Sequence, residues 1–445
     1  MRIDRGFADL VLKSALDRGA DLAEVYLRKS RTLRAESREA QVHALEHSSG
    51  FAYSLKVIRD GKLGFSYAND PDEITDVAGR AIESLDFTEE DRFLDVPSPE
   101  GDYPDVLTFD PDIDSMGADK ATEYAIGIEN AAYDYDPRVR KTRKSSATFT
   151  SYDLFVLNSK GLSFGYGATS ASATITAVAE GKGDSQMGWG YDGGRFLRDI
   201  DFIRAGREGA RRACAMLGAR RAAPGKVSLV IDSPVAVDFL SVASSMMSAD
   251  SVQKKKSLLD GKMGRTIMSK SVNIIDNPLI YGSPASKPMD GEGVRCRENT
   301  LVSEGVLMSY MHNTYTANKA GDITTANAIR GGAFTLPGVG PQCIALEPAS
   351  KAVSVEEMIS SIDSGVLIMD AMGVHTINPV SGDFSIGVSG LSIKKGKPSA
   401  PVKEAVISGN ILDFLGSIEA VGNDMRFFGS FGSPSLLVTG VDLSA

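Results

Sequence analysis

The sequence predicts an α+β fold, with an N-terminal mixed αβ domain followed by a larger, antiparallel β-rich C-terminal domain. Two observations predict this order. Up to about residue 221, segments with helical spacing of apolar residues alternate with strand-like runs, whereas from residue 222 onward strand-like runs separated by turn residues dominate. The chain has 445 residues, of which 42% are hydrophobic, so it can build substantial cores for two or three domains.

The first predicted unit is an αβ segment that covers residues 1–85. Apolar residues at helical spacing predict a helix at about 4–18. Strands follow between residues 22 and 68, with a tight hairpin turn at Arg-Asp-Gly, residues 59–61. A second helix is expected near residues 71–85.

An acidic linker is predicted over residues 86–116. Counting from residue 86 to 119, the sequence holds twelve acidic side chains and one basic side chain, Arg92, which gives a local charge of −11 in a chain of net charge −10. The prolines in the same stretch disfavour regular structure, so we expect an extended, solvated connection. The rest of the chain is close to neutral.

Residues 117–221 form the middle αβ segment that completes the N-terminal domain. We expect a helix at about 117–135 that ends before a proline, then strands near 139–157 and 162–180, and a helix at about 200–219. The β-rich C-terminal domain then covers residues 222–445 and starts with a strand at 226–231.

Composition excludes several classes of protein. No basic stripe suited to a phosphate backbone is present, so nucleic-acid binding is not expected. No apolar stretch approaches the roughly 20 residues of a membrane span. Cys214, Cys296 and Cys343 give an odd number of cysteines without C-x-x-C spacing, which favours reduced thiols and a cytoplasmic location.

Short polar signatures punctuate the strands of the last third of the chain. They read Ser-Gly-Asp-Phe-Ser at 381–385, Ile-Ser-Gly-Asn at 407–410, Gly-Asn-Asp at 422–424 and Gly-Ser-Pro-Ser at 432–435, after an upstream Gly-Val-Leu-Met-Ser-Tyr-Met at 305–311. Each signature suits a tight turn. In this order and spacing they resemble the TldD/PmbA family, known as modulators of DNA gyrase and as zinc-dependent peptidases.

The resemblance directs attention to a helix that starts at Ser233 and Pro234, both strong start signals. In the catalytic TldD branch this helix carries His-Glu-x-x-x-His, which binds zinc. Here the matching positions hold Leu240, Ser241 and Ser245, and residues 427–431 (Phe-Phe-Gly-Ser-Phe) occupy the stretch where the branch has a cysteine ligand. The resemblance therefore implies the PmbA branch, also called TldE, with no catalytic or metal-binding residue and no cofactor in this chain.

A rival metal site is suggested by His43-Ala-Leu-Glu46-His47, which matches an inverted zinc-peptidase pattern. On a helix the two imidazoles would lie roughly 6 Å apart and could share a zinc ion. On a strand they would lie about 13 Å apart and could not. Local composition favours a helix here, whereas the family resemblance implies a strand that pairs with the next hairpin.

The remaining candidate is a polar loop at residues 311–328, dense in hydrogen-bonding side chains. Such a loop suits either a peptide-lining or subunit-contact surface or a simple solvated connection. Its candidate residues are His312, Asn313, Thr314, Tyr315, Asn318, Thr324 and Asn327.

The resemblance implies a PmbA/TldE-like, non-catalytic subunit that assembles with a TldD-like zinc metalloprotease to process peptides or unfolded proteins, with zinc bound by the partner. One alternative is a stand-alone metallopeptidase that uses His43, Glu46 and His47. A second is a homodimeric peptide-binding module without a protease partner. Metal dependence and turnover would separate the enzyme from the binding module.

Overall fold

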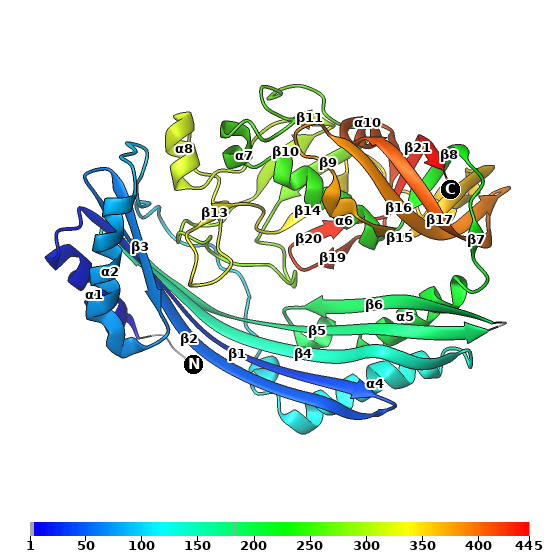
Figure 1. The fold of residues 1–445 in the computed structure, drawn as a ribbon, viewed down its shortest axis with the longest axis horizontal. Coiled ribbons are helices and arrows are strands. Elements are labelled where there is room, and N and C mark those ends of the chain that lie inside the picture. The colour runs from blue at the N-terminus through cyan, green and yellow to red at the C-terminus, as the bar shows by residue number, and fades with distance from the viewer. Residues whose placement is uncertain (1–3, 182, 445) are drawn as a thin grey trace.

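The structure is a computed structural model that describes residues 4–181 and 183–444 (Figure 1). Its N-terminal part is built on one antiparallel sheet of six strands in the order β3-β2-β1-β4-β5-β6. The strands are long and the sheet curves along its length (Figure 1). They are β1 (Leu22–Arg38), β2 (Gln41–Arg59), β3 (Lys62–Ala68), β4 (Val139–Asn158), β5 (Ser163–Gly181) and β6 (Asp184–Gly194).

Helices cover one face of this sheet, as the alternation along β1 shows. Val25 and Leu27 are buried in the core that the first two helices close, and Leu33 and Ala35 are buried under the next pair. All four positions are odd-numbered and therefore point to the same face of the strand. The helices are α1 (Arg5–Asp17), α2 (Ile74–Glu83), the short α3 (Pro111–Asp114), α4 (Ala118–Tyr133) and α5 (Phe202–Ala215).

The opposite face of the sheet lies toward the C-terminal part, which is above the concave side in Figure 1. On this face Tyr26 of β1 packs with Met289 and Ala333 of the C-terminal part. Glu24 is its even-numbered neighbour on the same strand. The alternation thus assigns one face of β1 to the helices and the other to the second half of the chain.

The C-terminal part contains two larger sheets. The first has the order β18-β21-β8-β15-β16-β17-β7, and the second has the order β11-β10-β9-β14-β20-β19. Because β21 also pairs with β17, five strands of the first sheet close on themselves. The strands are β7 (Arg220–Arg221), β8 (Gly225–Ile231), β9 (Val272–Asp276), β10 (Asn299–Ser303), β11 (Val306–Leu307), β12 (Ala328–Ile329), β13 (Gly338–Val339), β14 (Ile344–Pro348), β15 (Ser364–Met372), β16 (Asp383–Lys394), β17 (Lys397–Asn410), β18 (Ile418–Val421), β19 (Arg426–Phe428), β20 (Phe431–Ser433) and β21 (Leu436–Ser444).

One helix lies at the centre of the largest core. The apolar side of α6 (Ser233–Met246), with Phe239, Leu240 and Ala243, packs among the strands of both sheets. The remaining helices are short: α7 (Ala249–Gln253), α8 (Thr314–Ala320), α9 (Val355–Ser360) and α10 (Ile411–Gly416).

The polar signatures of the last third form hydrogen bonds that connect neighbouring turns. Asn410 donates to the Ser381 carbonyl and caps α10, and Asp424 accepts hydrogen bonds from the backbone and hydroxyl of Ser435. Gly382 has a φ of 82° and lies against Asn410, so a side chain would be strained there. These residues therefore hold strands in register and do not form a site of their own.

The predicted α+β class is confirmed, and the predicted helices and N-terminal strands are present within a few residues of their expected ends. Two details differ. The C-terminal sheets are mixed, since β8–β15, β7–β17 and β14–β20 pair in parallel. Strand β6 was not predicted because four of its residues are glycines, which are unfavourable in strands.

The linker segment, residues 86–116, is extended but only partly solvated. Val96 is buried, the carbonyl of Pro97 accepts from the buried Asn158 amide, and Thr108 pairs with the edge residue Thr169. Tyr103 stacks on Phe164 at 3.6 Å between ring centroids. The expectation of a fully solvated linker was wrong in this respect, because its few apolar and aromatic residues anchor it to both parts of the chain.

In the described part of the chain, no helix has both the length and the apolar character needed to cross a lipid bilayer.

Candidate functional site

Helix α6 carries the positions that resemble the family's metal ligands. Asp232 caps its N-terminus and Pro234 lies in its first turn. Leu240 is buried in the C-terminal core, whereas Ser241 and Ser245 are exposed. The Ser245 hydroxyl donates to the Val242 carbonyl of its own helix. The exposed stripe of α6 thus offers hydroxyl groups and no imidazole.

A hairpin formed by β19 and β20 packs beside α6. Ser233 at the start of the helix donates to the Ser433 carbonyl at 2.7 Å, which fastens the hairpin to the helix. This hairpin contains the stretch where the resemblance would place a cysteine ligand, and Phe427 and Phe428 occupy it. Helix and hairpin together therefore lack the donor set that zinc requires.

The three cysteines lie elsewhere. Cys296 and Cys343 are buried, and Cys343 pairs with the Ser283 hydroxyl, while Cys214 is partly exposed on α5. Burial raises the pKa of both buried thiols. Within residues 4–181 and 183–444, no group of three or more His, Cys, Asp or Glu side chains is arranged to hold a metal ion.

A cleft of about 860 Å³ lies between the two parts of the chain, bordered by the first half of α6. We call it the α6 cleft. Edge strand β6 contributes Met187 and Trp189, both substantially exposed, and the end of β15 contributes the exposed Met372. Asp238 of α6 also lines the cleft, and burial followed by the neighbouring Asp370 raises its pKa, against the opposing effect of His375. The cleft thus combines exposed apolar side chains with charged ones, which are Arg212, Arg221, Asp238, Asp370, Lys403 and Glu404.

Buried ion pairs fix one end of the α6 cleft. Arg212 of α5 pairs with Glu208 and with Asp232, the cap of α6, and donates to the Met369 carbonyl at 2.9 Å. Arg426 of β19 pairs with Glu208 at 2.7 Å. Burial works against ionisation of Glu208, but the hydrogen bond from Arg426 and the nearby Arg212 hold its pKa below the usual range. These contacts tie α5 to both sheets of the C-terminal part.

The rival zinc site is contradicted by the backbone. Residues 43–47 lie in the extended strand β2, so His43 and His47 lie about 13 Å apart, and the pairing of β2 with β1 is irregular at His43, which has no partner in the register. His47 accepts a hydrogen bond from Arg31 at 3.2 Å, and Glu46 lies 3.9 Å from Arg34. The predicted cluster of His43, Glu46 and His47 does not form, because the long pairing with β1 overrides the local preference for helix.

The polar segment 311–328 is not one loop, and this expectation was wrong. Its first half contains helix α8, which starts with a reciprocal capping box between Asn313 and Thr316. His312, Asn313 and Thr314 are buried, and burial lowers the pKa of His312. Asn327 is fully buried and donates to Asp276 and to the Gly340 carbonyl. Most of this polarity therefore satisfies buried backbone and side-chain groups.

Two residues of α8 do reach another part of the chain. The Tyr315 hydroxyl donates to Asp91 at 2.7 Å, and Asn318 donates to the Phe93 carbonyl at 3.1 Å, both in the linker segment. The hydrogen bond to Asp91, followed by burial, raises the pKa of Tyr315 to about 12. Thr324, by contrast, donates to the His312 carbonyl within its own segment. Two of the candidate residues thus contact the linker segment of the same chain, and the role of the segment as a peptide-lining or subunit-contact surface stays a prediction.

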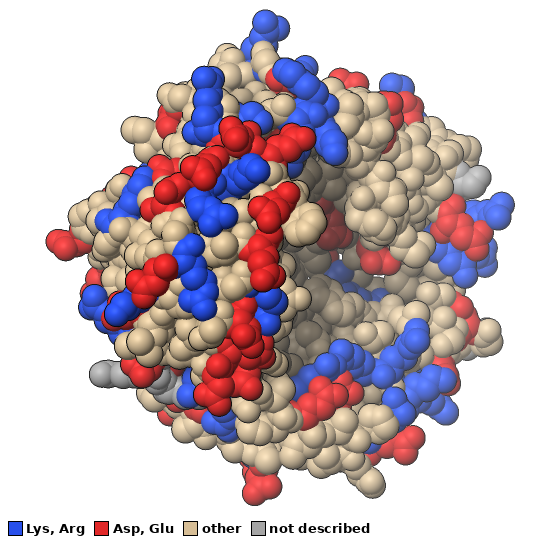
Figure 2. Space-filling model, turned by 60° about the vertical axis from the view of Figure 1, so that its left-hand side comes forward, with Lys and Arg blue, Asp and Glu red and all other residues tan. Residues whose placement is uncertain are grey.

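A second cavity, of about 430 Å³, opens beside α8. It lies between the ends of β2 and β3, residues 88–95 of the linker segment, α7, α8 and residues 336–339. We call it the Lys56 pocket, after the buried lysine that lines it. These elements lie on the side of the molecule that comes forward in Figure 2, where acidic side chains gather along one rim of a deep hollow.

A buried ionic cluster forms the inner end of the Lys56 pocket. Glu24, whose side chain is 0% exposed, pairs with Lys56 at 3.0 Å and with Arg330 at 2.5 Å. Glu292 lies 3.8 Å from Lys56 and also accepts a hydrogen bond from the Thr314 backbone at 2.9 Å. The guanidinium of Arg330 lies 4.6 Å from the ring centre of Tyr26. None of these charged residues was predicted, because no local pattern connects partners that lie from 32 to 306 positions apart in the sequence.

Asp290 adds a further carboxyl group behind Glu292. It accepts hydrogen bonds from the backbone of Glu292 and Val294 at 2.9 Å and of Ala328 at 3.1 Å. Burial and the charge of Glu292 nevertheless raise its pKa from 3.8 to about 7. The carboxyl is therefore half protonated near neutral pH in the folded chain.

This pKa predicts a pH dependence of stability. Between about pH 4 and pH 7 the folded chain keeps the Asp290 proton and the unfolded chain does not, so stability falls as the pH rises through 7. We expect the wild type to lose about 1 kcal/mol relative to Asp290→Asn between pH 6 and pH 8. Urea unfolding of both proteins at several pH values measures this difference, and parallel curves would contradict it.

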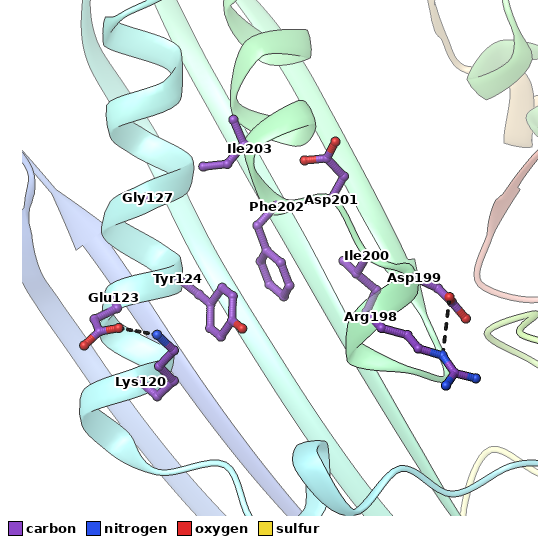
Figure 3. Close-up of a pocket in the computed structure, with 10 residues that line it drawn as sticks. All are labelled: Lys120, Glu123, Tyr124, Gly127, Arg198, Asp199, Ile200, Asp201, Phe202 and Ile203. Carbon is purple, nitrogen blue, oxygen red and sulfur yellow. Dashed lines mark hydrogen bonds and ion pairs between the residues drawn. The ribbon is translucent and has the colours of Figure 1, made fainter.

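A third, open depression of about 570 Å³ lies between α4 and α5 (Figure 3). Four of its charged side chains pair with one another, Lys120 with Glu123 and Arg198 with Asp199, as the dashed lines in Figure 3 mark, and the fifth, Asp201, caps α5. Tyr124 packs on Phe202 at 4.3 Å between ring centroids. With its charges paired on an exposed rim, this depression is a groove between packed helices.

Comparisons with known proteins agree with this architecture. Profiles described as PmbA/TldA metallopeptidase domain 1, central domain and C-terminal domain match residues 23–85, 111–217 and 224–445. The chain is 27% identical over 417 residues to the metalloprotease PmbA of Escherichia coli O157:H7, covering 92% of this chain and 88% of that protein. It is 28% identical over 432 residues to a metalloprotease of Methanothermobacter thermautotrophicus, covering 96% and 93%.

Solved structures show the same fold. A protein of Bacteroides thetaiotaomicron, whose name proposes a modulator of DNA gyrase, has a TM-score of 0.90 at 25% identity over 100% of both chains. TldE from Thermococcus kodakarensis has a TM-score of 0.89 at 19% identity and covers 99% of this chain and 100% of that chain.

Fold and site together define a two-part α+β protein of the metallopeptidase-related class, in which the α6 positions that resemble the family's metal ligands hold leucine and serine. The three matching profiles cover most of the sequence. The chain belongs to the PmbA/TldD family.

Proposed function

We propose that this chain is a PmbA/TldE-like, non-catalytic subunit that assembles with a TldD-type zinc metalloprotease and helps it to process peptides or unfolded proteins. The proposal rests on the residues that α6 has at the three positions resembling the family's metal ligands. Leu240 is buried in the core, and the exposed Ser241 and Ser245 carry only hydroxyl groups. A neutral hydroxyl does not replace imidazole or thiolate on zinc. In this proposal the partner binds the zinc ion and both subunits act in the cytoplasm.

The α6 cleft supports a role in holding peptide. Its exposed methionines and Trp189 can pack against varied side chains, because thioether and aromatic groups adapt to different apolar partners. Strand β6 pairs only with β5 among the described strands, so its free edge could add an extended segment through backbone hydrogen bonds. Such binding would read little sequence and suits unfolded chains.

The test combines metal analysis with reconstitution. The purified, tag-free chain is expected to hold substoichiometric zinc and to leave an unstructured protein such as casein uncleaved. Mixing it with the TldD-like chain of the same organism should give a complex on a sizing column and zinc-dependent cleavage. A partner whose motif histidines are replaced by alanine serves as the control, since it should still form the complex without cleaving.

The alternatives give different results in the same experiment. Stoichiometric zinc and cleavage by this chain alone would overturn the proposal and make it a metallopeptidase. A self-associated dimer that binds unfolded protein but ignores the TldD-like chain would instead indicate a homodimeric peptide-binding module. Cleavage by this chain alone should be measured directly, because its bacterial and archaeal relatives are named metalloproteases.

A further inference from the structure

The Lys56 pocket combines apolar walls with a surplus of carboxylates. Ile58, Leu63, Leu94 and Val339 supply aliphatic surface from four different segments of the chain. Five acidic side chains and two basic ones line the same cavity. An aliphatic stem that ends in a positive charge would match both properties.

Some of the acidic side chains of the pocket already have partners within the chain, but not all of them do. Lys254 pairs with Asp250 at 2.9 Å, and Asp95 pairs with Lys160 at 2.6 Å, which lies outside the pocket. Asp91 accepts hydrogen bonds from Tyr315 and from the Phe93 backbone. Lys56 itself already forms an ion pair with Glu24.

Glu89 and Glu292 are the acidic groups that remain, and of these two only Glu292 is buried, since Glu89 is exposed. Its side chain is 3% exposed, yet it lines the pocket. Oε2 accepts the Thr314 backbone hydrogen bond, whereas Oε1 accepts no hydrogen bond from the described residues, and Lys56 Nζ lies 3.8 Å from it. The fully enclosed carboxylate oxygen of this cluster that accepts no hydrogen bond is Glu24 Oε2, whereas Glu292 belongs to the lining of the cavity and could accept a further donor there.

The buried cluster also has an imbalance of charge. The carboxylates of Glu24, Glu292 and Asp290 are matched by only two cations, those of Lys56 and Arg330. Burial, followed by the charge of Glu292, raises the pKa of Asp290, so this carboxyl carries part of the compensating positive charge as a proton. A cation bound at Glu292 would balance the charge.

We propose that the Lys56 pocket binds a lysine or arginine side chain of a peptide, with its aliphatic stem against Leu63, Leu94 and Val339 and its cationic end on Glu292 Oε1. The peptide as carrier rests on the proposed function, whereas the recognition of the side chain rests on the pocket alone. The pocket would give an otherwise sequence-tolerant peptide binder a preference for basic residues.

The experiment measures binding of two short acetylated, amidated peptides that differ only in one central residue, lysine or norleucine. Norleucine keeps the aliphatic stem and lacks the charge. By calorimetry with the full-length chain, we expect the lysine peptide to bind at least about tenfold more tightly, as a charge-assisted hydrogen bond in a partly desolvated site implies. An arginine peptide should behave like the lysine peptide.

Three variants locate the effect. Glu292→Gln keeps an acceptor for the Thr314 backbone and removes the charge, so it should abolish the lysine preference. Leu336→Trp, at an exposed position on the rim, should block entry without disturbing the core. Asp86→Asn is the matched control, because it removes an exposed charge of the same linker segment outside the pocket and should leave the preference unchanged.

The outcomes separate this inference from the proposed function. Equal binding of lysine and norleucine peptides, or a preference that survives both Glu292→Gln and Leu336→Trp, overturns the pocket assignment even if the complex with the TldD-like chain forms. A lysine preference that depends on Glu292 supports the assignment even if no such complex forms, because the assay needs neither partner nor cleavage.

Discussion

Replacing Arg330 with methionine is expected to destabilise the protein by about 3 kcal/mol, since removing one partner of a buried ion pair leaves an uncompensated charge. The Arg330 side chain is 2% exposed and pairs with Glu24, which has no exposed surface. It also donates to the carbonyls of Gly291 at 2.7 Å and Thr335 at 2.8 Å. Methionine keeps much of the volume but none of these contacts. Urea unfolding followed by tryptophan fluorescence measures the loss.

The matched control for this prediction is Lys226→Met. Lys226 lies 3.9 Å from Asp442, and both side chains are more than half exposed, so its removal should change the unfolding free energy by less than about 0.5 kcal/mol. The double variant Glu24→Gln with Arg330→Met should recover part of the loss, since it removes the unpaired charge. Equal effects of the two single variants would show that the buried cluster contributes no more than a surface pair.

Replacing Gly190 with alanine should cost at least about 3 kcal/mol, near the upper end of the usual cost of overpacking a core. A Cβ at this position of β6 would lie 2.0 Å from the Ala205 carbonyl oxygen and 2.8 Å from the Gly209 backbone nitrogen of α5. Both obstacles are backbone atoms of a helix packed on the sheet. The helix would have to move away, which would also disturb Arg212 and its ion pairs at the α6 cleft.

Gly50→Ala is the control for Gly190→Ala. Gly50 is also a strand glycine, in β2, but it is exposed and a Cβ there would meet nothing within 4 Å. Alanine at this position should be neutral or slightly stabilising, since glycine is unfavourable in a strand interior. Thermal unfolding of both variants tests the pair. A similar melting temperature for the two would mean that α5 does not rest on the backbone of β6 as described.

The sequence was sufficient for features that depend on local pattern or on the family resemblance. The α+β class, the ends of α1 and α4, and the start of α6 at Ser233 and Pro234 all follow from periodicity and capping residues. The extended conformation of β2 required the resemblance, because its local composition favours helix. The identity of Leu240, Ser241 and Ser245 at the positions that resemble the family's metal ligands is read from the sequence, and the absence of a metal there stays a prediction.

Features that depend on distant partners could not be predicted. Strand β6 has glycines where α5 packs directly on it, and the residues of the strand alone do not predict that a helix lies there. Glu24 and Arg330 are 306 residues apart in the sequence, and no spacing rule connects them. The polarity of residues 311–328 was interpreted as a peptide-lining or subunit-contact surface or as a solvated connection, whereas Asn327 and Asn313 use their side chains to satisfy buried groups.

The two sets of buried ion pairs have a consequence for how the protein moves. Arg212 with Glu208 and Asp232 joins the two parts of the chain at one place, and Arg330 and Lys56 with Glu24 and Glu292 join them at another. With only one such set of ion pairs, the two parts could rotate about it as about a hinge. Two separate sets prevent this rotation. If the chain binds peptides as we propose, the distance between its two parts is set before binding, so little binding energy would be spent on closing the protein around the peptide.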